Sequence, residues 1–128
     1  MSKDFRKLKV CKRSHQLVLD LNRITILFPR TESYRLTAQI RRAGVSIPSN
    51  IVEGCGRSSD TELAMFCDVA RGSASELEYQ LLLAHDLKLI QPDDYEQLVQ
   101  QTTEIKRILT VFFRRLRARG RFIRLLKP

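Results

Sequence analysis

The sequence predicts an all-α fold, an antiparallel up-down four-helix bundle. Two observations favour this class: apolar residues recur at helical spacing along most of the chain, and no stretch shows the alternation of a strand. Four segments of roughly 22 to 26 residues, each about 33 to 39 Å long, would be joined by short connectors. With 128 residues, of which 43% are hydrophobic and 29% charged, the chain has the composition of one globular domain with a single core.

The first helix is expected to run from about Phe5 to Leu27, and Pro29 would interrupt it. One row of residues at helical spacing forms its apolar face, and a second row widens that face. The first row is Leu8, Cys11, His15, Val18, Asn22 and Ile26, and the second is Val10, Leu17, Leu21, Ile24 and Phe28. Because apolar residues cover so much of this helix, we expect it to have neighbours on two sides.

The second helix is expected to begin after a cap at Thr31 or Ser33, to contain Pro48 and to end near Glu53. Its apolar residues keep one helical phase through the proline: Leu36, Ile40, Ala43, Ile47, Ile51 and Gly54. Since proline lacks an amide donor and presses on the carbonyl four residues earlier, we expect one helix that is kinked there. In the alternative, Pro48 begins a separate helix with Ile47 at the N-cap, a position that favours Ser, Thr, Asp or Asn.

The third helix is expected to be capped by Ser58, Ser59 or Asp60, whose side-chain oxygens can accept hydrogen bonds from the first amide groups. It would fray near residues 87–91. Its buried face would consist of Leu63, Phe66, Ala70, Ala74, Leu77, Leu81 and Ala84.

The fourth helix has the clearest pattern, because its core positions alternate steps of three and four. These positions are Tyr95, Leu98, Thr102, Ile105, Leu109, Phe112 and Leu116. Pro92 suits the first turn, where Asp93 and Asp94 complement the positive end of the helix dipole. Gly120 is expected to end this helix, which divides the chain into a four-helix-bundle domain, residues 1–120, and a basic C-terminal tail, residues 121–128.

A polar row accompanies the apolar face of the second helix. Its members follow one another at i, i+4, i+8 and i+11 and therefore share a face: Arg42, Ser46, Asn50 and Glu53. The run ARGSASELE on the third helix offers polar partners amid small residues, namely Arg71, Ser73 and Glu76. Because a buried polar group without a hydrogen bond costs roughly 1 to 3 kcal/mol, we expect these residues to form a structural polar seam between the two helices.

These two runs carry a family resemblance. RRAGVSIPSNIVEGCGR and ARGSASELE resemble RRA-x-SIP-x-N-x-x-EG-x-GR and ARGS-x-x-ELE, which mark the second and third helices of the bacterial large-subunit ribosomal RNA intervening-sequence proteins. The resemblance covers nearly the whole chain, although the family more often has an aromatic residue near Cys11. It implies a four-helix bundle that assembles as a ring-like homopentamer without established enzymatic activity. It also implies kinship with the accessory variability determinant of diversity-generating retroelements, a basic pentameric bundle that works with a reverse transcriptase and nucleic acid.

Charge is distributed unevenly along the chain, whose formal net charge is +9. Residues 105–128 contain nine basic and no acidic side chains, whereas residues 1–104 contain fourteen of each. Within the latter segment, residues 1–13 carry a net charge of +5 and residues 14–104 carry −5. In an up-down bundle the start of the first helix and the end of the fourth lie together, so we expect one positive patch at that end.

Such a patch predicts binding to RNA or DNA through the backbone or its shape, because cations that neutralise phosphates release condensed counterions. Phe112, Phe113 and Phe122 lie among the arginines, whose guanidinium groups grip phosphates and stack on bases. The expected nucleic-acid-binding residues are Lys7, Lys9, Lys12, Arg13, Arg107, Arg114, Arg115, Arg117, Arg119, Arg121 and Arg124. In the alternatives, the tail is a solvated extension, or the protein is a scaffold whose basic end docks a reverse transcriptase, another acidic protein or an anionic membrane surface.

We expect no enzymatic activity, no cofactor and no metal. His15 and His85 lie in apolar helical contexts without a carboxylate or cysteine at ligand spacing, and the polar seam, the one conceivable active site, has no nearby general base. Cys11, Cys55 and Cys67 suggest neither a disulfide framework nor a zinc motif and are expected to be buried thiols. With neither a targeting segment nor a membrane span evident, the sequence favours a cytoplasmic protein.

Overall fold

The computed structural model describes residues 3–126, except for the side chains of residues 31–32 and 122–124. This part of the chain is entirely helical apart from its turns, which confirms the predicted all-α class with four helices. The elements are a short 3-10 helix, Phe5–Lys7, and the α-helices α1 (Lys9–Thr25), α2 (Arg30–Cys55), α3 (Asp60–Asp86) and α4 (Pro92–Leu126).

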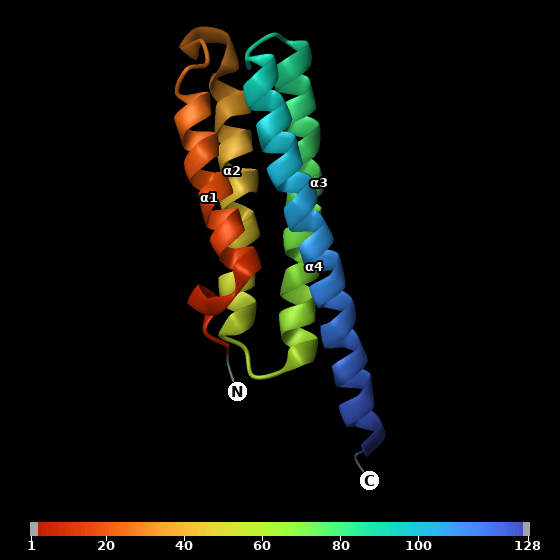
Figure 1. Cartoon of the computed structure of the whole chain (residues 1–128). Coiled ribbons are helices and arrows are strands. Elements are labelled where there is room, and N and C mark those ends of the chain that lie inside the picture. The colour runs from red at the N-terminus through yellow and green to blue at the C-terminus, as the bar shows by residue number, and fades with distance from the viewer. Residues whose placement is uncertain (1–2, 127–128) are drawn as a thin grey trace.

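The four helices form a bundle in which each helix packs against two others. α1 packs against α2 and α4, and α3 packs against the same two helices. The connections α1–α2 and α3–α4 lie at one end of the bundle, whereas the α2–α3 connection and both chain termini lie at the other (Figure 1). α4 is the longest helix, with 35 residues, and its last turns project beyond the rest of the bundle (Figure 1).

The core runs along the bundle between all four helices. Its largest fully buried side chains are Leu17, Leu21, Ile24, Ile40, Ile47, Ile51, Leu77, Leu81, Leu98, Ile105 and Leu109. On α1 the predicted second row is buried, whereas His15, Asn22 and Ile26 of the first row are exposed. The expectation is therefore wrong for these three residues, whereas Cys11 of the first row is buried in the core and Leu8 packs against it.

Two predicted helix starts differ from the structure. The chain makes a 3-10 turn at Phe5–Lys7, passes through an extended Leu8 and begins α1 only at Lys9. Asp4 caps the 3-10 turn by accepting a hydrogen bond from the Arg6 amide at 3.0 Å. The predicted cap of the second helix at residue 31 or 33 is also wrong, because α2 begins at Arg30 with Pro29 as its N-cap residue.

The start of α3 agrees with one of the predicted caps. The hydroxyl of Ser59 accepts a hydrogen bond from the Glu62 amide at 3.1 Å, so Ser59 is the N-cap. This bond satisfies one of the amide groups that the first turn of a helix leaves free.

The predicted effects of Pro48 and Gly120 on their helices differ in how they compare with the structure. α2 continues through Pro48, which confirms one helix rather than two, while the predicted kink stays a prediction. α4 continues through Gly120 to Leu126, so the expectation that Gly120 ends the helix is wrong. A Cβ atom at Gly120 would lie 2.8 Å from Thr61 Oγ1, so a larger residue here would require the exposed Thr61 side chain to move.

Candidate nucleic-acid interface

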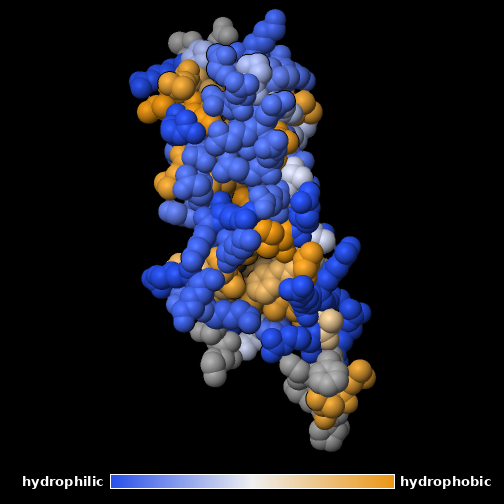
Figure 2. Space-filling model, viewed as in Figure 1, coloured by the Kyte–Doolittle hydropathy of each residue, from blue (hydrophilic) through white to orange (hydrophobic). Residues whose placement is uncertain are grey.

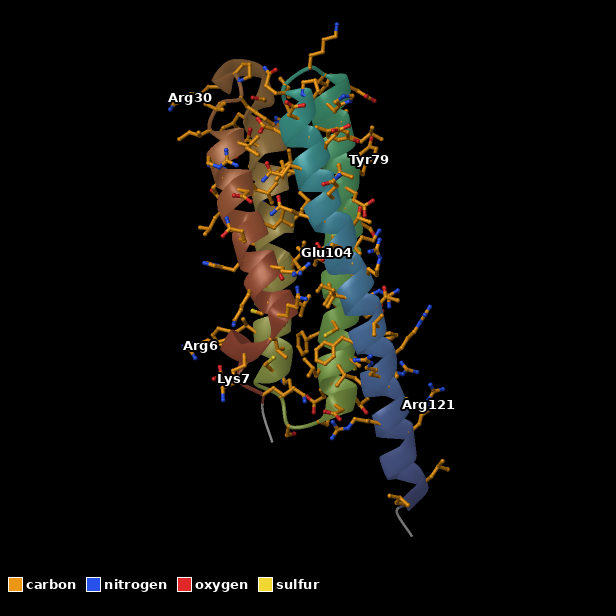
Figure 3. The ribbon with its side chains drawn as sticks, in the orientation of Figure 1. Arg6, Lys7, Arg30, Tyr79, Glu104 and Arg121 are labelled. Atoms are coloured by element: carbon orange, nitrogen blue, oxygen red, sulfur yellow. The ribbon has the colours of Figure 1, made fainter. Side chains whose placement is uncertain are left out.

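The two basic segments of the chain lie at the same end of the bundle. We call this the basic end and define it by residues 3–13 and by α4 from residue 105 onward. Figure 3 shows Arg6 and Lys7 beside the start of α1 and Arg121 on α4 at this end, whereas Arg30 lies at the opposite end. The two segments meet there because α1 starts at the end of the bundle toward which α4 runs (Figure 1).

Ion pairs between helices use some of the predicted binding residues. Arg13 on α1 pairs with Glu104 on α4, and the Arg119 Nε atom lies 3.1 Å from Asp60 Oδ2 at the start of α3. These two arginines form ion pairs between α4 and its neighbours. Their acidic partners offset their charge. Both are therefore weaker candidates for binding phosphate than the sequence indicates.

Seven of the other predicted cations are available to a ligand. These seven are exposed and make neither an ion pair nor a side-chain hydrogen bond within the described part of the chain: Lys7, Lys9, Lys12, Arg107, Arg114, Arg115 and Arg121. Arg117 stacks its guanidinium over the Phe113 ring, 5.7 Å from the centroid. The side chain of Arg124 lies outside the described residues, as does that of Phe122.

The aromatic residues near these cations differ in their contacts. Phe113 is half-buried, and a second guanidinium, that of Arg71 on α3, lies 5.1 Å from its ring centroid. Phe113 therefore joins α3 to α4 through cation–π contacts rather than offering a free surface. Phe112, also half-buried, lies on another side of α4 and faces a groove.

This groove lies between the start of α1 and α4 and has a volume of about 370 Å³. Three of the available cations, Lys9, Arg107 and Arg115, line it together with apolar side chains: Leu8, Val10, Ile108, Val111 and Phe112. Figure 2 shows hydrophobic surface between α1 and α4 toward the basic end, bordered by hydrophilic side chains. Sequence reasoning missed the groove, because helical spacing does not tell which exposed positions of two different helices face each other.

The predicted polar seam forms over a shorter length than expected. The hydroxyls of Ser46 and Ser73 lie 2.7 Å apart and join α2 to α3. The Asn50 side-chain amide donates to the Ser46 carbonyl at 2.7 Å and to the Ser46 hydroxyl at 3.1 Å. These three half-buried residues are the part of the predicted seam that the structure brings together.

The remaining seam residues point to other partners. Glu53 pairs with Arg57 at 3.1 Å, Arg71 with Asp68 at 3.4 Å, and Glu76 accepts a hydrogen bond from Gln80 at 3.0 Å. Arg71 and Glu76 thus have their partners within α3, and the partner of Glu53 lies in the connection after α2, so none of these three charged groups pairs across α2 and α3 as predicted. Arg42 is exposed and makes no polar contact with any described residue.

The three cysteines are buried, and His85 packs against an aromatic ring. Cys11, Cys55 and Cys67 are free and buried, and burial raises the pKa of each thiol, that of Cys67 to about 12. His85 stacks on Tyr95 with their ring centroids 4.3 Å apart. Among the side chains that the structure describes, no group of three or more His, Cys, Asp or Glu could hold a metal ion.

Within residues 3–126, no helix combines the length and the apolar character that crossing a bilayer requires.

The fold and its charges define a class: a small helical-bundle protein that presents unpaired cations at one end. A family model, 23S rRNA-intervening sequence protein, matches residues 6–111, and the chain therefore belongs to that family. A crystal structure from Bacteroides thetaiotaomicron, described as a protein of unknown function from the S23 ribosomal protein family, is similar with a TM-score of 0.75. The two chains are 25% identical, and the match covers 81% of this chain and 97% of the other. No curated protein matches the chain.

Proposed function

We propose that the basic end binds structured RNA through its backbone phosphates, without catalysing a reaction. The observation that carries this proposal is the group of seven exposed cations at one end of the bundle, none of them offset by a described acidic side chain. Cations that are free of ion pairs can each neutralise a phosphate and release a counterion, which drives binding. The description of the family as 23S rRNA-intervening sequence proteins supports RNA as the nucleic acid.

Two double variants test the proposal. Arg114→Gln with Arg121→Gln removes two exposed charges from the basic end, and Arg30→Gln with Arg35→Gln removes two exposed charges from the start of α2 at the opposite end. Both variants lower the net charge equally, so they separate a local contact from a general electrostatic effect. The affinity for a labelled RNA hairpin is measured at several salt concentrations.

For the unaltered protein we expect the logarithm of the affinity to fall linearly with the logarithm of the salt concentration. The slope should become shallower by up to about 0.9 for each phosphate contact that the basic-end variant loses, and it should stay unchanged in the control. Equal slopes for both variants would refute a binding surface at this end. If no RNA binds at moderate salt, the alternative takes precedence, in which the bundle is a scaffold such as an accessory subunit of a reverse transcriptase.

We also propose that the chain assembles with copies of itself, as a ring-like homopentamer. The observation that supports self-association is an exposed face of α3 on which Met65, Val69 and Tyr79 are 61%, 54% and 63% exposed in the single chain, while the number of copies rests on the family resemblance of the sequence. Exposed apolar side chains that share one helix face are typical of association surfaces. Sedimentation should give a mass five times that of the 14.9 kDa chain, and Val69→Glu should lower it. A monomeric mass for the unaltered protein would contradict this proposal.

A further inference from the structure

The geometry of the groove between α1 and α4 leads to a more specific proposal about the ligand. We propose that the groove receives an unpaired base of the bound RNA, so that the protein prefers RNA with unpaired nucleotides to a continuous duplex. This inference rests on the proposed function, because it specifies which RNA the basic end binds.

The groove combines an apolar floor with a cationic rim. Val111 and Phe112 on α4 and Leu8 before α1 provide surface on which the flat face of a base can lie. Arg107, Val111 and Arg115 follow one another at intervals of four and therefore share a face of α4. The two arginines lie about 12 Å apart along the helix axis, on either side of the apolar floor. Lys9 adds a third positive charge from the first turn of α1.

The charges of the rim favour an anionic ligand over a purely apolar one. Lys9, Arg107 and Arg115 are all exposed and without an acidic partner among the described residues. A nucleotide has both required parts, since its base is flat and weakly hydrated and its phosphates are negative. The apolar floor can therefore contact the base of a nucleotide while the cations contact its phosphates, whereas a lone phosphate or a hydrocarbon chain would use only one of the two features.

The size of the groove favours an unpaired nucleotide. A volume of about 370 Å³ lies at the lower end of the range of about 300 to 1,000 Å³ that is common for small-molecule sites. In an A-form helix the base faces are stacked against one another and cannot reach such a surface. A bulged or looped base can leave the stack and present its face. Every base has a flat face that can lie on the apolar floor, so we expect stacking there to show little preference among the four bases.

Three labelled RNA duplexes of equal length, formed from two separate strands, test the inference by fluorescence anisotropy at one salt concentration. The first is fully paired, the second has one unpaired nucleotide, and the third has an abasic nucleotide at that position. The second and third have the same phosphates and differ only in the base. We expect the second to bind roughly tenfold more tightly than the third, as for a base that stacks on a protein side chain.

Two matched substitutions assign the effect to the groove. Val111 is 42% exposed, and Val45 on α2, outside the groove, is 44% exposed. Val111→Ser should abolish the difference between the base-containing and abasic RNAs while leaving the salt dependence unchanged. Val45→Ser should preserve the difference, because it makes the same chemical change at a similar exposure elsewhere.

The outcomes separate this inference from the proposed function. If all three RNAs bind with equal affinity, the groove does not receive a base, although the basic end still binds RNA. The groove would then be assigned to another ligand, such as an acidic amphipathic helix of a protein partner. If none of the three RNAs binds, the proposed function itself is overturned, and the inference with it.

Discussion

The hydrogen bond between the Ser46 and Ser73 hydroxyls allows a quantitative test of how α2 and α3 are held together. The perturbation is a double-mutant cycle of Ser46→Ala, Ser73→Ala and the combined variant. Each single substitution removes the 2.7 Å contact between the helices. Ser46→Ala also removes the acceptor of the 3.1 Å bond from Asn50, whose second bond, to the Ser46 carbonyl, remains.

The magnitudes follow from these contacts. A hydrogen bond contributes about 0.5 to 1.5 kcal/mol net, and alanine gains about 0.5 kcal/mol over serine from its higher helix propensity. We therefore expect the free energy of unfolding to fall by about 0.5 kcal/mol or less for Ser73→Ala and by about 1 kcal/mol for Ser46→Ala. The propensity gain belongs to each residue separately and cancels in the cycle. The combined variant should thus be about 1 kcal/mol more stable than the sum of the single effects predicts.

The assay is urea unfolding followed by circular dichroism, at two protein concentrations because self-association would add to the stability. A control cycle pairs Ser46→Ala with Ser75→Ala. Ser75 is two residues from Ser73 but exposed and without a described hydrogen-bond partner. The control effects should add to within about 0.3 kcal/mol. If the Ser46 and Ser73 effects add equally well, the contact does not stabilise the fold and the structural interpretation of the seam is refuted.

Three further predictions concern stability. Gly54→Ala should lower the free energy of unfolding by about 1 to 2 kcal/mol, because a Cβ there would lie 2.8 Å from Leu63 Cδ1 and 2.9 Å from Phe66 Cβ. This overpacking outweighs the higher helix propensity of alanine. If the variant is more stable than the unaltered protein in urea, the close packing at Gly54 is contradicted. Ser59→Ala should cost about 1 kcal/mol in the same assay, and no loss would argue against its role as a cap. Burial raises the pKa of Cys67 from 9.0 to about 12, so the folded state holds the thiol proton more tightly than the unfolded state does. The contribution of this thiol to the free energy of unfolding should therefore be complete below about pH 9 and should decrease as the pH rises toward 12. Cys67→Ala should make that fall less steep, and an unchanged fall would contradict the assignment to this thiol.

The helices could be predicted from the sequence because their buried residues repeat at helical spacing. The predicted core face of α2 is buried at every position, from Leu36 to Gly54, and it passes Pro48 without a change of phase. On α1 the same kind of evidence was ambiguous, since two apolar rows were present; the second row is buried throughout, whereas only Cys11 of the first is buried. Periodicity shows that a face can be buried, whereas the neighbouring helices decide which face is.

The rest of the site depends on contacts between distant residues. Gly120 resembles a helix stop by type, yet it lies within α4, where its missing Cβ leaves room for Thr61 at the start of α3. The sequence could not show which arginines are free to bind a phosphate. Arg13 and Arg119 form ion pairs with acidic residues more than fifty positions away in the sequence. Their neutralisation could be recognised only when the helices were placed beside one another.

The projecting end of α4 links the stability of the helix to its charge. Beyond the start of α3 this segment has no neighbouring helix in the single chain (Figure 1), and an isolated helical segment of a few turns is marginal in water. Like charges at i and i+4, such as Arg117 and Arg121, lower its stability by about 0.2 to 0.5 kcal/mol per pair. The helix dipole favours cations at this terminus and offsets part of that cost. If the basic end binds a polyanion as proposed, the ligand would reduce this repulsion, and the charges that weaken the free helix would then favour the helix in the complex.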